Sequence, residues 1–289
     1  MITRSTLLHL RIPFSVFLLP VFCFAASQAA SSNYWEYLLL FVILHLFLYP
    51  ASNGYNSYYD KDEDSIGGLE KPPEVTRDLL GTSLLFDGFA LLLGMYFGWE
   101  FVVLLLLYGL ASKAYSHDKI RLKAYPIGGL LVVGFFQGAV TYFMTLVALD
   151  GLSWGAALQM DIWLPALLMT LLLTGSYPMT QIYQHEEDAR RGDKTLSRIL
   201  GIRGTFVFTA LAFGMAALGF LFYFERFHHF GYFLVFQAFL APPIGYFAWW
   251  LWRTWNHPER ADFRSTMRLN LISSVAMIAF FTLIAFVEI

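Results

Sequence analysis

An amide and two carboxylates follow one another at every fourth position early in the chain. They are Asn56, Asp60 and Asp64, within an acidic run at residues 56–64. In a helix, residues four apart differ by about 40° in angle and about 6 Å along the axis, so one face would present all three side chains. Oxygen-only ligands favour Mg²⁺, which keeps several waters and often shares a substrate phosphate. A solvated acidic turn at a helix end is the alternative interpretation.

A second acidic stretch lies far along the chain, at residues 184–195. Gln184 and Asp188 are again four apart, and Glu187 precedes Asp188. The same residue types could hold a second cation. The alternative is a solvated amphipathic helix end, stabilised by Glu–Arg pairs worth a few tenths of a kcal/mol each.

A basic stretch lies between the two acidic ones. It contains Tyr115, Lys119, Arg121 and Lys123. Taken alone, this is ordinary juxtamembrane charge that fixes topology and contacts anionic membrane lipid. Arg and Lys are also the side chains that bind phosphate, Arg in a bidentate manner.

The composition places these stretches in a membrane protein. The chain has 289 residues, of which 57% are hydrophobic and only 14% charged, whereas soluble domains have about 25% charged residues. A net charge of −2 argues against nucleic acid as a partner. Cys23 is the single cysteine, which excludes an internal disulfide and a thiolate metal site. No long polar interval suggests a second domain, so we expect one domain over residues 1–289.

Nine apolar segments approach the roughly 20 residues that cross a bilayer as a helix. They are Ile12–Ala29, Trp35–Ser52, Leu79–Phe97, Phe101–Tyr115, Ile127–Leu149, Ile162–Met179, Phe206–Phe224, Phe230–Trp252 and Leu269–Ile289. We therefore expect an all-α polytopic membrane protein, a bundle of nine transmembrane helices around a central cavity open to the cytoplasmic side.

The basic residues predict the orientation. With the N-terminus in the cytoplasm, every Lys and Arg except Arg226 falls on the cytoplasmic side, as the positive-inside rule requires. We expect a bacterial inner membrane, with both acidic stretches cytoplasmic. Residues 1–30 could instead be a cleaved signal peptide, but the apolar run from Ile12 is long for a signal core, which favours retention.

Together the three polar stretches resemble the UbiA-type family of membrane-embedded prenyltransferases. The family's first motif, Asn-x-x-x-Asp-x-x-x-Asp, is similar to the run from Asn56 to Asp64. Its Tyr-x-x-x-Lys element is similar to Tyr115 and Lys119. Its second motif, Asp-x-x-x-Asp followed by Gly and Thr, is matched by the residues Asp188, Gly192 and Thr195.

The resemblance implies Mg²⁺-dependent transfer of an isoprenoid group from an allylic polyprenyl diphosphate to a lipophilic, aromatic acceptor, as in quinone or related prenylated-lipid biosynthesis. It implies that Asn56, Asp60 and Asp64 hold one Mg²⁺, and that Asp188 with Glu187 holds a second.

The resemblance also implies roles for the basic stretch and for the first position of the second motif. Lys119, Arg121 and Lys123 would bind the diphosphate, with Tyr115 beside them. Gln184 departs from the family pattern, which has an aspartate there. A neutral amide can coordinate through its oxygen, and a neighbouring glutamate would supply the missing carboxylate.

Two other functions fit parts of the sequence. A UbiA-type terpene cyclase would use the same ionisation step, with the substrate's own double bond as the nucleophile. A membrane transporter would use the acids as an ion site, although transporters tend to place such ligands near the bilayer midplane, and these acids lie at the ends of spans.

Overall fold

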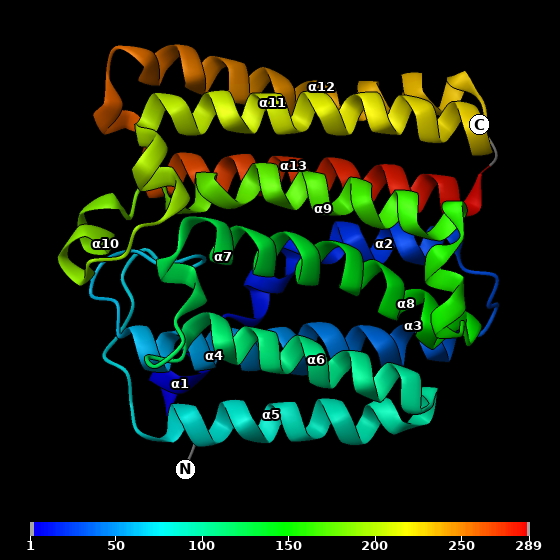
Figure 1. The fold of residues 1–289 in the computed structure, drawn as a ribbon, viewed down its shortest axis with the longest axis horizontal. Helices are drawn as coiled ribbons and strands as arrows, with labels where there is room; N and C mark the ends of the chain where they lie inside the picture. Colours follow the sequence, from blue (N-terminus) through cyan, green and yellow to red (C-terminus); the bar gives the residue numbers. More distant parts are fainter. Residues whose placement is uncertain (1–2, 288–289) are drawn as a thin grey trace.

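Apolar runs become helices throughout residues 3–287, the part of the chain that the computed structural model describes. Figure 1 shows the long helices lying side by side. In chain order the elements are α1 (Arg4–His9), η1 (Ile12–Phe17), α2 (Leu19–Gln28), α3 (Tyr34–Phe41), η2 (Val42–Leu48), α4 (Tyr49–Asp60), α5 (Asp78–Gly94), η3 (Met95–Phe97), α6 (Trp99–Ser116), η4 (Leu122–Ala124), α7 (Pro126–Leu131), η5 (Val132–Val140), α8 (Thr141–Asp150), η6 (Trp154–Leu158), α9 (Met160–Gln181), α10 (His185–Arg191), α11 (Leu196–Phe227), α12 (Phe230–Trp255), η7 (Pro258–Arg260) and α13 (Phe263–Phe286). No strand occurs among these described residues, which confirms the all-α prediction.

Within the described part of the chain, seven helical segments are long and apolar enough to cross a membrane. They are Tyr34–Asp60, Asp78–Phe97, Pro126–Asp150, Met160–Gln181, Leu196–Phe227, Phe230–Trp255 and Phe263–Phe286. An eighth results if Arg4–Phe17 and Leu19–Gln28, which are bent by 47° to each other, count as one span. The chain is therefore an integral multi-pass membrane protein.

The predicted span Phe101–Tyr115 is helix α6, which is not among these seven or eight segments. It packs against α4 and α5. Lys113 on α6 places Nζ 2.5 Å from the carboxylate of Asp87 on α5, and such pairing is how charged side chains are accommodated within spans. The count of nine spans stays a prediction, and the last predicted span ends at Ile289, outside the described residues.

The N-terminal segment packs into the bundle. Leu10 and Phe24 are fully buried, and the Thr6 hydroxyl donates a hydrogen bond of 2.8 Å to the carboxylate of Asp78, at the start of α5. The described part of residues 1–30 thus contributes to the interior of the protein, and retention of this segment stays a prediction.

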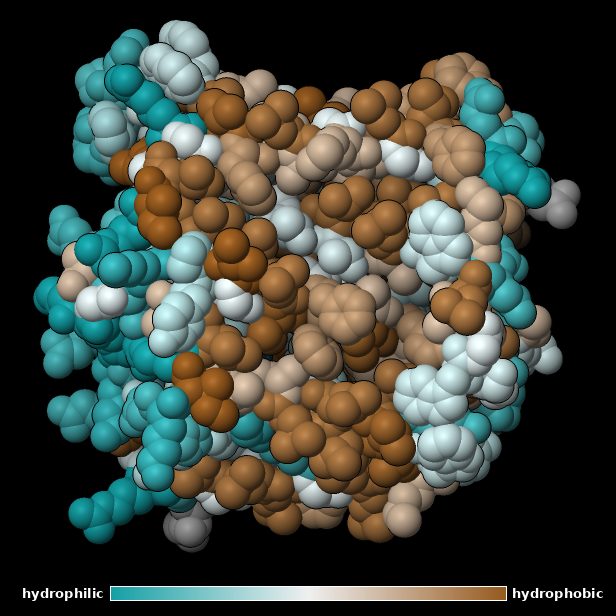
Figure 2. Space-filling view, in the orientation of Figure 1, coloured by the Kyte–Doolittle hydropathy of each residue, from teal (hydrophilic) through white to brown (hydrophobic). Residues whose placement is uncertain are grey.

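Large apolar side chains also cover the outside of the bundle. Leu211 and Leu218 on α11 are 64% and 68% exposed. Soluble monomers rarely expose broad contiguous apolar surface. Figure 2 shows such a surface across the middle of one face, with hydrophilic side chains concentrated along one edge. Since an α-helix satisfies its own backbone hydrogen bonds, this face can lie against lipid.

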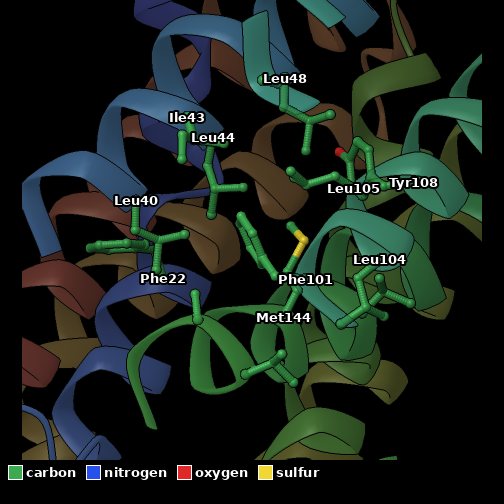
Figure 3. Packing of buried hydrophobic residues seen from close by; sticks show 14 of the residues in the cluster. Phe22, Leu40, Ile43, Leu44, Leu48, Phe101, Leu104, Leu105, Tyr108 and Met144 are labelled. Atoms are coloured by element: carbon green, nitrogen blue, oxygen red, sulfur yellow. The ribbon is translucent and has the colours of Figure 1, made fainter. Parts of the chain in front are cut away.

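The interior is filled by apolar and aromatic side chains. In Figure 3, Phe22 from α2, Leu40 from α3 and Leu44 from η2 meet Phe101 from α6 and Met144 from α8. A second buried cluster joins α2 to α8, α9 and α11–α13. The helices that enclose the central cavity are thereby held in fixed positions.

The polar loops gather at one end of the bundle. Figure 1 shows α10 at the left end, next to the long connection between α4 and α5. The backbone N–H of Lys194 donates to the carbonyl of Ala124 at 3.0 Å, which joins the second acidic stretch to the basic one. The three stretches singled out in the sequence therefore lie on the same end.

Candidate active site

The first acidic motif is only partly helical. Helix α4 ends at Asp60, and Lys61 follows in the left-handed conformation with φ of 48°. Asn56 and Asp60 therefore share a helix face as predicted, but the prediction that Asp64 continues this face is wrong. The turn at Lys61 places Asp64 outside the cavity, with its side chain 60% exposed and paired with Arg190.

Asn56 is used to hold its neighbours. Its Nδ2 donates to Asp60 Oδ2 at 2.5 Å and to Ser116 Oγ at 3.1 Å. Its Oδ1 accepts a hydrogen bond of 3.2 Å from the guanidinium of Arg11. The amide oxygen predicted to bind metal is therefore engaged, and Asn56 acts in this arrangement as a positioning residue for Asp60.

Asp60 is buried and surrounded by cations. Its side chain is 1% exposed. Lys123 forms an ion pair with it, the Arg121 guanidinium lies 3.4 Å away, and that of Arg191 lies 3.7 Å away. A buried carboxylate needs such partners, because removing it from water costs several kcal/mol.

The second acidic motif lies on the short helix α10. Gln184 precedes this helix and donates from Nε2 to the carbonyl of Ser65 at 3.1 Å. Glu187 is buried, and its Oε2 has no hydrogen-bond partner among the described residues. The Thr195 hydroxyl donates to Asp188 Oδ2 at 2.9 Å, which ties the threonine after the motif to its aspartate.

The two acidic motifs meet. The backbone N–H of Glu63 donates to Glu187 Oε1 at 3.2 Å, and Arg191 of the second stretch lies 3.1 Å from Asp62 of the first. Residues more than a hundred positions apart thus form one site at the end of the bundle.

The basic stretch is divided between the cavity and its surroundings. Lys123 and Tyr115 line the cavity, and the Tyr115 hydroxyl is 3.0 Å from that of Tyr177. Arg121 makes a bidentate pair with Asp193, at 2.8 and 3.0 Å. Lys119 is exposed and does not line the cavity, because α6 ends at Ser116 and the following turn directs the chain outward.

A cavity of about 580 Å³ extends from these polar groups into the bundle. Its polar end is lined by Asn56, Asp60, Asp62, Gln184, Glu187 and Asp188, together with Arg11, Lys123 and Arg191. Its inner walls are mainly apolar, and include Phe136, Phe213, Phe220, Phe236, Leu240 and Met277. Such a space suits a ligand with a charged head and a long apolar tail.

Two carboxyl groups on α10, those of Glu187 and Asp188, have raised pKa values. Burial raises the pKa of the Glu187 carboxyl to about 7, and repulsion from Asp62 adds to the effect. Burial likewise raises the pKa of the Asp188 carboxyl to about 6, although the hydrogen bond from Thr195 acts to lower this pKa. These carboxyls are poorly compensated by the protein itself, which is typical of cation sites and catalytic sites.

Four residues of this site are absent from the sequence-based prediction of binding residues. Asp62 lies in the acidic run but off the four-residue spacing. Arg191 and Asp193 adjoin the second motif. Arg11 comes from the N-terminal segment and donates to the carbonyls of Gly67 and Asn53 at 3.1 Å. The first three are charged and lie close to the acidic motifs in the sequence, so they could have been proposed as binding residues. Nothing in the sequence links Arg11 to these motifs.

A family model described as the UbiA prenyltransferase family matches residues 17–272. The chain belongs to the UbiA prenyltransferase family. This confirms the resemblance and makes the chain a member of a family of prenyltransferases. Among curated proteins, none matches the sequence.

Solved structures share the UbiA fold. A UbiA homologue from Archaeoglobus fulgidus bound to GPP and Mg²⁺ is 19% identical, with a TM-score of 0.67 over 98% of this chain and 100% of that one. The apo structure of a UbiA homologue from Aeropyrum pernix is 19% identical, with a TM-score of 0.72 over 94% and 98%. A digeranylgeranylglyceryl phosphate synthase is 16% identical, with a TM-score of 0.60 over 96% and 97%. At these identities the likeness establishes the fold.

Proposed function

We propose that this protein transfers the isoprenoid group of an allylic polyprenyl diphosphate to a lipophilic acceptor with the help of Mg²⁺. The observation that carries the proposal is the meeting of two acidic motifs at the mouth of one apolar cavity. Membership of the UbiA family supports it. So do the UbiA homologues whose structures contain GPP or DMAPP with Mg²⁺.

The acidic groups present fit a magnesium ion. They supply oxygen ligands only, and Glu187 offers a buried oxygen, Oε2, that accepts no hydrogen bond within residues 3–287. Among residues 3–287, no three Asp, Glu, His or Cys side chains already surround a common point. Mg²⁺ does not need such a cage, because one or two carboxylates with waters and substrate phosphate suffice. Asp60, Glu187 and Asp188 are the residues that would hold it.

The reaction breaks the bond between C1 of the isoprenoid and the diphosphate oxygen, and both electrons leave with the diphosphate. Bound Mg²⁺ would stabilise the negative charge that builds on this leaving group. Lys123 donates further N–H groups from a position already beside Asp60. Arg121 holds Asp193 and approaches Asp60, so it supports the site from outside the cavity.

The cavity would protect the allylic cation that remains. Its apolar walls exclude water, which would otherwise capture the cation, and its aromatic faces attract positive charge. The acceptor then attacks the cation and, if it is an aromatic ring, loses a proton to restore its conjugation. An acceptor that enters from the lipid phase fits quinone or related prenylated-lipid biosynthesis.

The first experiment measures diphosphate release from a prenyl diphosphate by the purified protein in lipid nanodiscs, in the presence of membrane extract that contains the acceptor. Asp60→Asn and Asp188→Asn should each lower the rate about 10³-fold, which corresponds to about 4 kcal/mol of transition-state stabilisation. A chelator should abolish the activity and Mg²⁺ should restore it. Full activity of both variants, or indifference to the chelator, would contradict the proposal.

Product analysis separates the transferase from the cyclase. With a prenyl diphosphate alone, a cyclase releases a cyclic hydrocarbon or alcohol. A transferase yields its product only when membrane extract that contains the acceptor is added. Mass spectrometry of the two reactions identifies the acceptor by the mass that the isoprenoid adds.

We further propose that the chain forms one domain over residues 1–289 in a bacterial inner membrane, with its N-terminus and the mouth of the cavity in the cytoplasm. The concentration of Lys and Arg at the end of the bundle that carries both acidic motifs supports this orientation. Soluble prenyl diphosphate would then reach the site from the cytoplasm.

A further inference from the structure

Arg191, at the end of α10, contacts carboxylates from both acidic stretches. One of its terminal nitrogens lies 3.1 Å from Asp62 and 3.7 Å from Asp60, and the other lies 3.4 Å from Glu187. The side chain is 23% exposed and lines the cavity. A single guanidinium therefore occupies the place where the acids of the two motifs come together.

The second acidic motif has one carboxylate fewer for a second metal ion than the family's pattern has. Gln184 stands where the family has an aspartate, so this position offers an amide oxygen without a negative charge, and its Nε2 donates to the carbonyl of Ser65. Glu187 uses Oε1 for the N–H of Glu63 and for Arg191. Asp62 is paired with Arg191 as well. The residues present thus fit one Mg²⁺ but not two.

We propose that Arg191 acts as a fixed cation in place of the second metal, so that the diphosphate binds between one Mg²⁺ and the Arg191 guanidinium. This inference rests on the proposed function. A guanidinium presents paired N–H groups to phosphate oxygens and keeps its charge at all working pH values. It can therefore neutralise the part of the diphosphate that a second ion would otherwise bind, without accepting or losing a proton.

The count of bound ions tests this directly. We would titrate the wild-type protein in nanodiscs with Mn²⁺ in the presence of geranyl thiolodiphosphate, whose C–S bond resists ionisation, and follow free Mn²⁺ by electron paramagnetic resonance. One bound Mn²⁺ per chain is expected. Two bound ions per chain in the wild type would overturn the inference and leave the proposed function standing.

Substitutions at Arg191 and Gln184 provide a second test of the inference. Arg191→Ala should weaken binding of the thiolodiphosphate roughly 10- to 100-fold, the usual range for losing hydrogen bonds from a charged group, and Arg191→Lys should recover part of it. The double variant Gln184→Asp with Arg191→Ala restores a carboxylate and removes the guanidinium, so it should bind two Mn²⁺ ions.

Arg190→Ala is the matched control. Arg190 is the neighbouring arginine on the same helix, but it is 62% exposed and pairs with Asp64 outside the cavity. Its removal should leave the ion count at one and the affinity within about threefold, since exposed ion pairs contribute little. Equal affinity of the Arg191→Ala variant and the wild type would contradict the inference. No bound Mn²⁺ at all would overturn the proposed function, and this inference with it.

Discussion

At the scale of single residues, the site is a balance between buried acids and the cations that hold them. Asp60 is within 4 Å of Lys123, Arg121 and Arg191. These cations offset part of the cost of burying the carboxylate, because an unpaired buried charge would cost several kcal/mol. Asp60 would help to hold a bound Mg²⁺, and the N–H groups of Lys123 and Arg191, which line the cavity, would be available to the diphosphate.

The end of α4 at Asp60 leads to a prediction about the two aspartates that follow. Asp62→Asn should lower prenyl-transfer activity about 10- to 100-fold, because the Asp62 carboxylate lines the cavity and pairs with Arg191. Asp64→Asn should change it by less than about threefold, because Asp64 is exposed and its ion pair lies at the surface. Single-turnover rates at saturating Mg²⁺ make the comparison. A larger loss for Asp64→Asn would show that the helical register continues past Asp60 in the working enzyme.

The raised pKa values of Glu187 and Asp188 predict a pH dependence of metal binding. A carboxyl binds Mg²⁺ only when deprotonated. With pKa values of about 7 and about 6, both groups are charged at pH 8, whereas at pH 6 Glu187 is mostly and Asp188 half protonated. Mg²⁺ affinity should therefore fall about 10- to 20-fold from pH 8 to pH 6.

Calorimetric titration of the protein in nanodiscs with Mg²⁺ at several pH values measures this effect. In Glu187→Gln only Asp188 remains to titrate, so the decline should begin about one pH unit lower. An affinity that stays constant between pH 6 and pH 8 would show that neither carboxyl binds the metal.

At the scale of helices, the cavity depends on a close contact between η5 and α9. An added Cβ on Gly138 would lie 2.6 Å from the Cα of Thr170, and one on Gly134 would lie 2.4 Å from the hydroxyl of Thr174. Small residues of this kind let helix backbones approach each other in membranes. The close approach orients η5 so that Phe136 and Gln137 line the cavity.

A pair of glycine substitutions tests this contact. Gly138→Ala should destabilise the protein by about 1–3 kcal/mol, because the backbone of Thr170 cannot move away without disturbing α9. Gly88→Ala on α5 is the control, since an added Cβ there has nothing within 4 Å. It should be neutral or stabilising, because alanine favours helix by up to about 1 kcal/mol over glycine. Thermal unfolding in detergent measures both, and equal melting temperatures would contradict the prediction.

At the scale of the whole molecule, charge and hydrophobicity are sorted along the helix axes. The apolar band in Figure 2 is bordered on one edge by the polar end that holds α10 and the acidic motifs. Under the proposed function, this arrangement would let a charged diphosphate enter the cavity from water and an apolar acceptor enter it from lipid.

The proposed orientation predicts which loops react from the cytoplasm. In a Cys23→Ser background, Asn256→Cys between α12 and η7 should react with a membrane-impermeant maleimide only in inside-out vesicles. Ser153→Cys between α8 and η6 should react only in intact spheroplasts. The two loops lie at opposite ends of the bundle, so each is the control for the other. The reverse pattern would show that the N-terminus lies outside.

Features of the fold and of the site could be predicted from the sequence where they depend on residues that are close together in the chain. Apolar runs determine helices locally, because a lipid environment leaves the backbone few other ways to satisfy its hydrogen bonds. The three polar stretches could be recognised as candidate sites from the sequence. Charged side chains next to hydrocarbon cost free energy, so they are rare there and usually have a function. The all-α fold, the membrane location and the family followed from these local signals.

The details of the site required the tertiary structure. The left-handed turn at Lys61 decides that Asp62 faces the cavity and Asp64 does not, and a regular four-residue spacing cannot reveal where a helix stops. Arg11 reaches Asn56 from a different helix, and Arg191 joins two motifs that are far apart in the chain. Such pairings depend on how whole helices pack against one another, so no local pattern of residue types could have specified them.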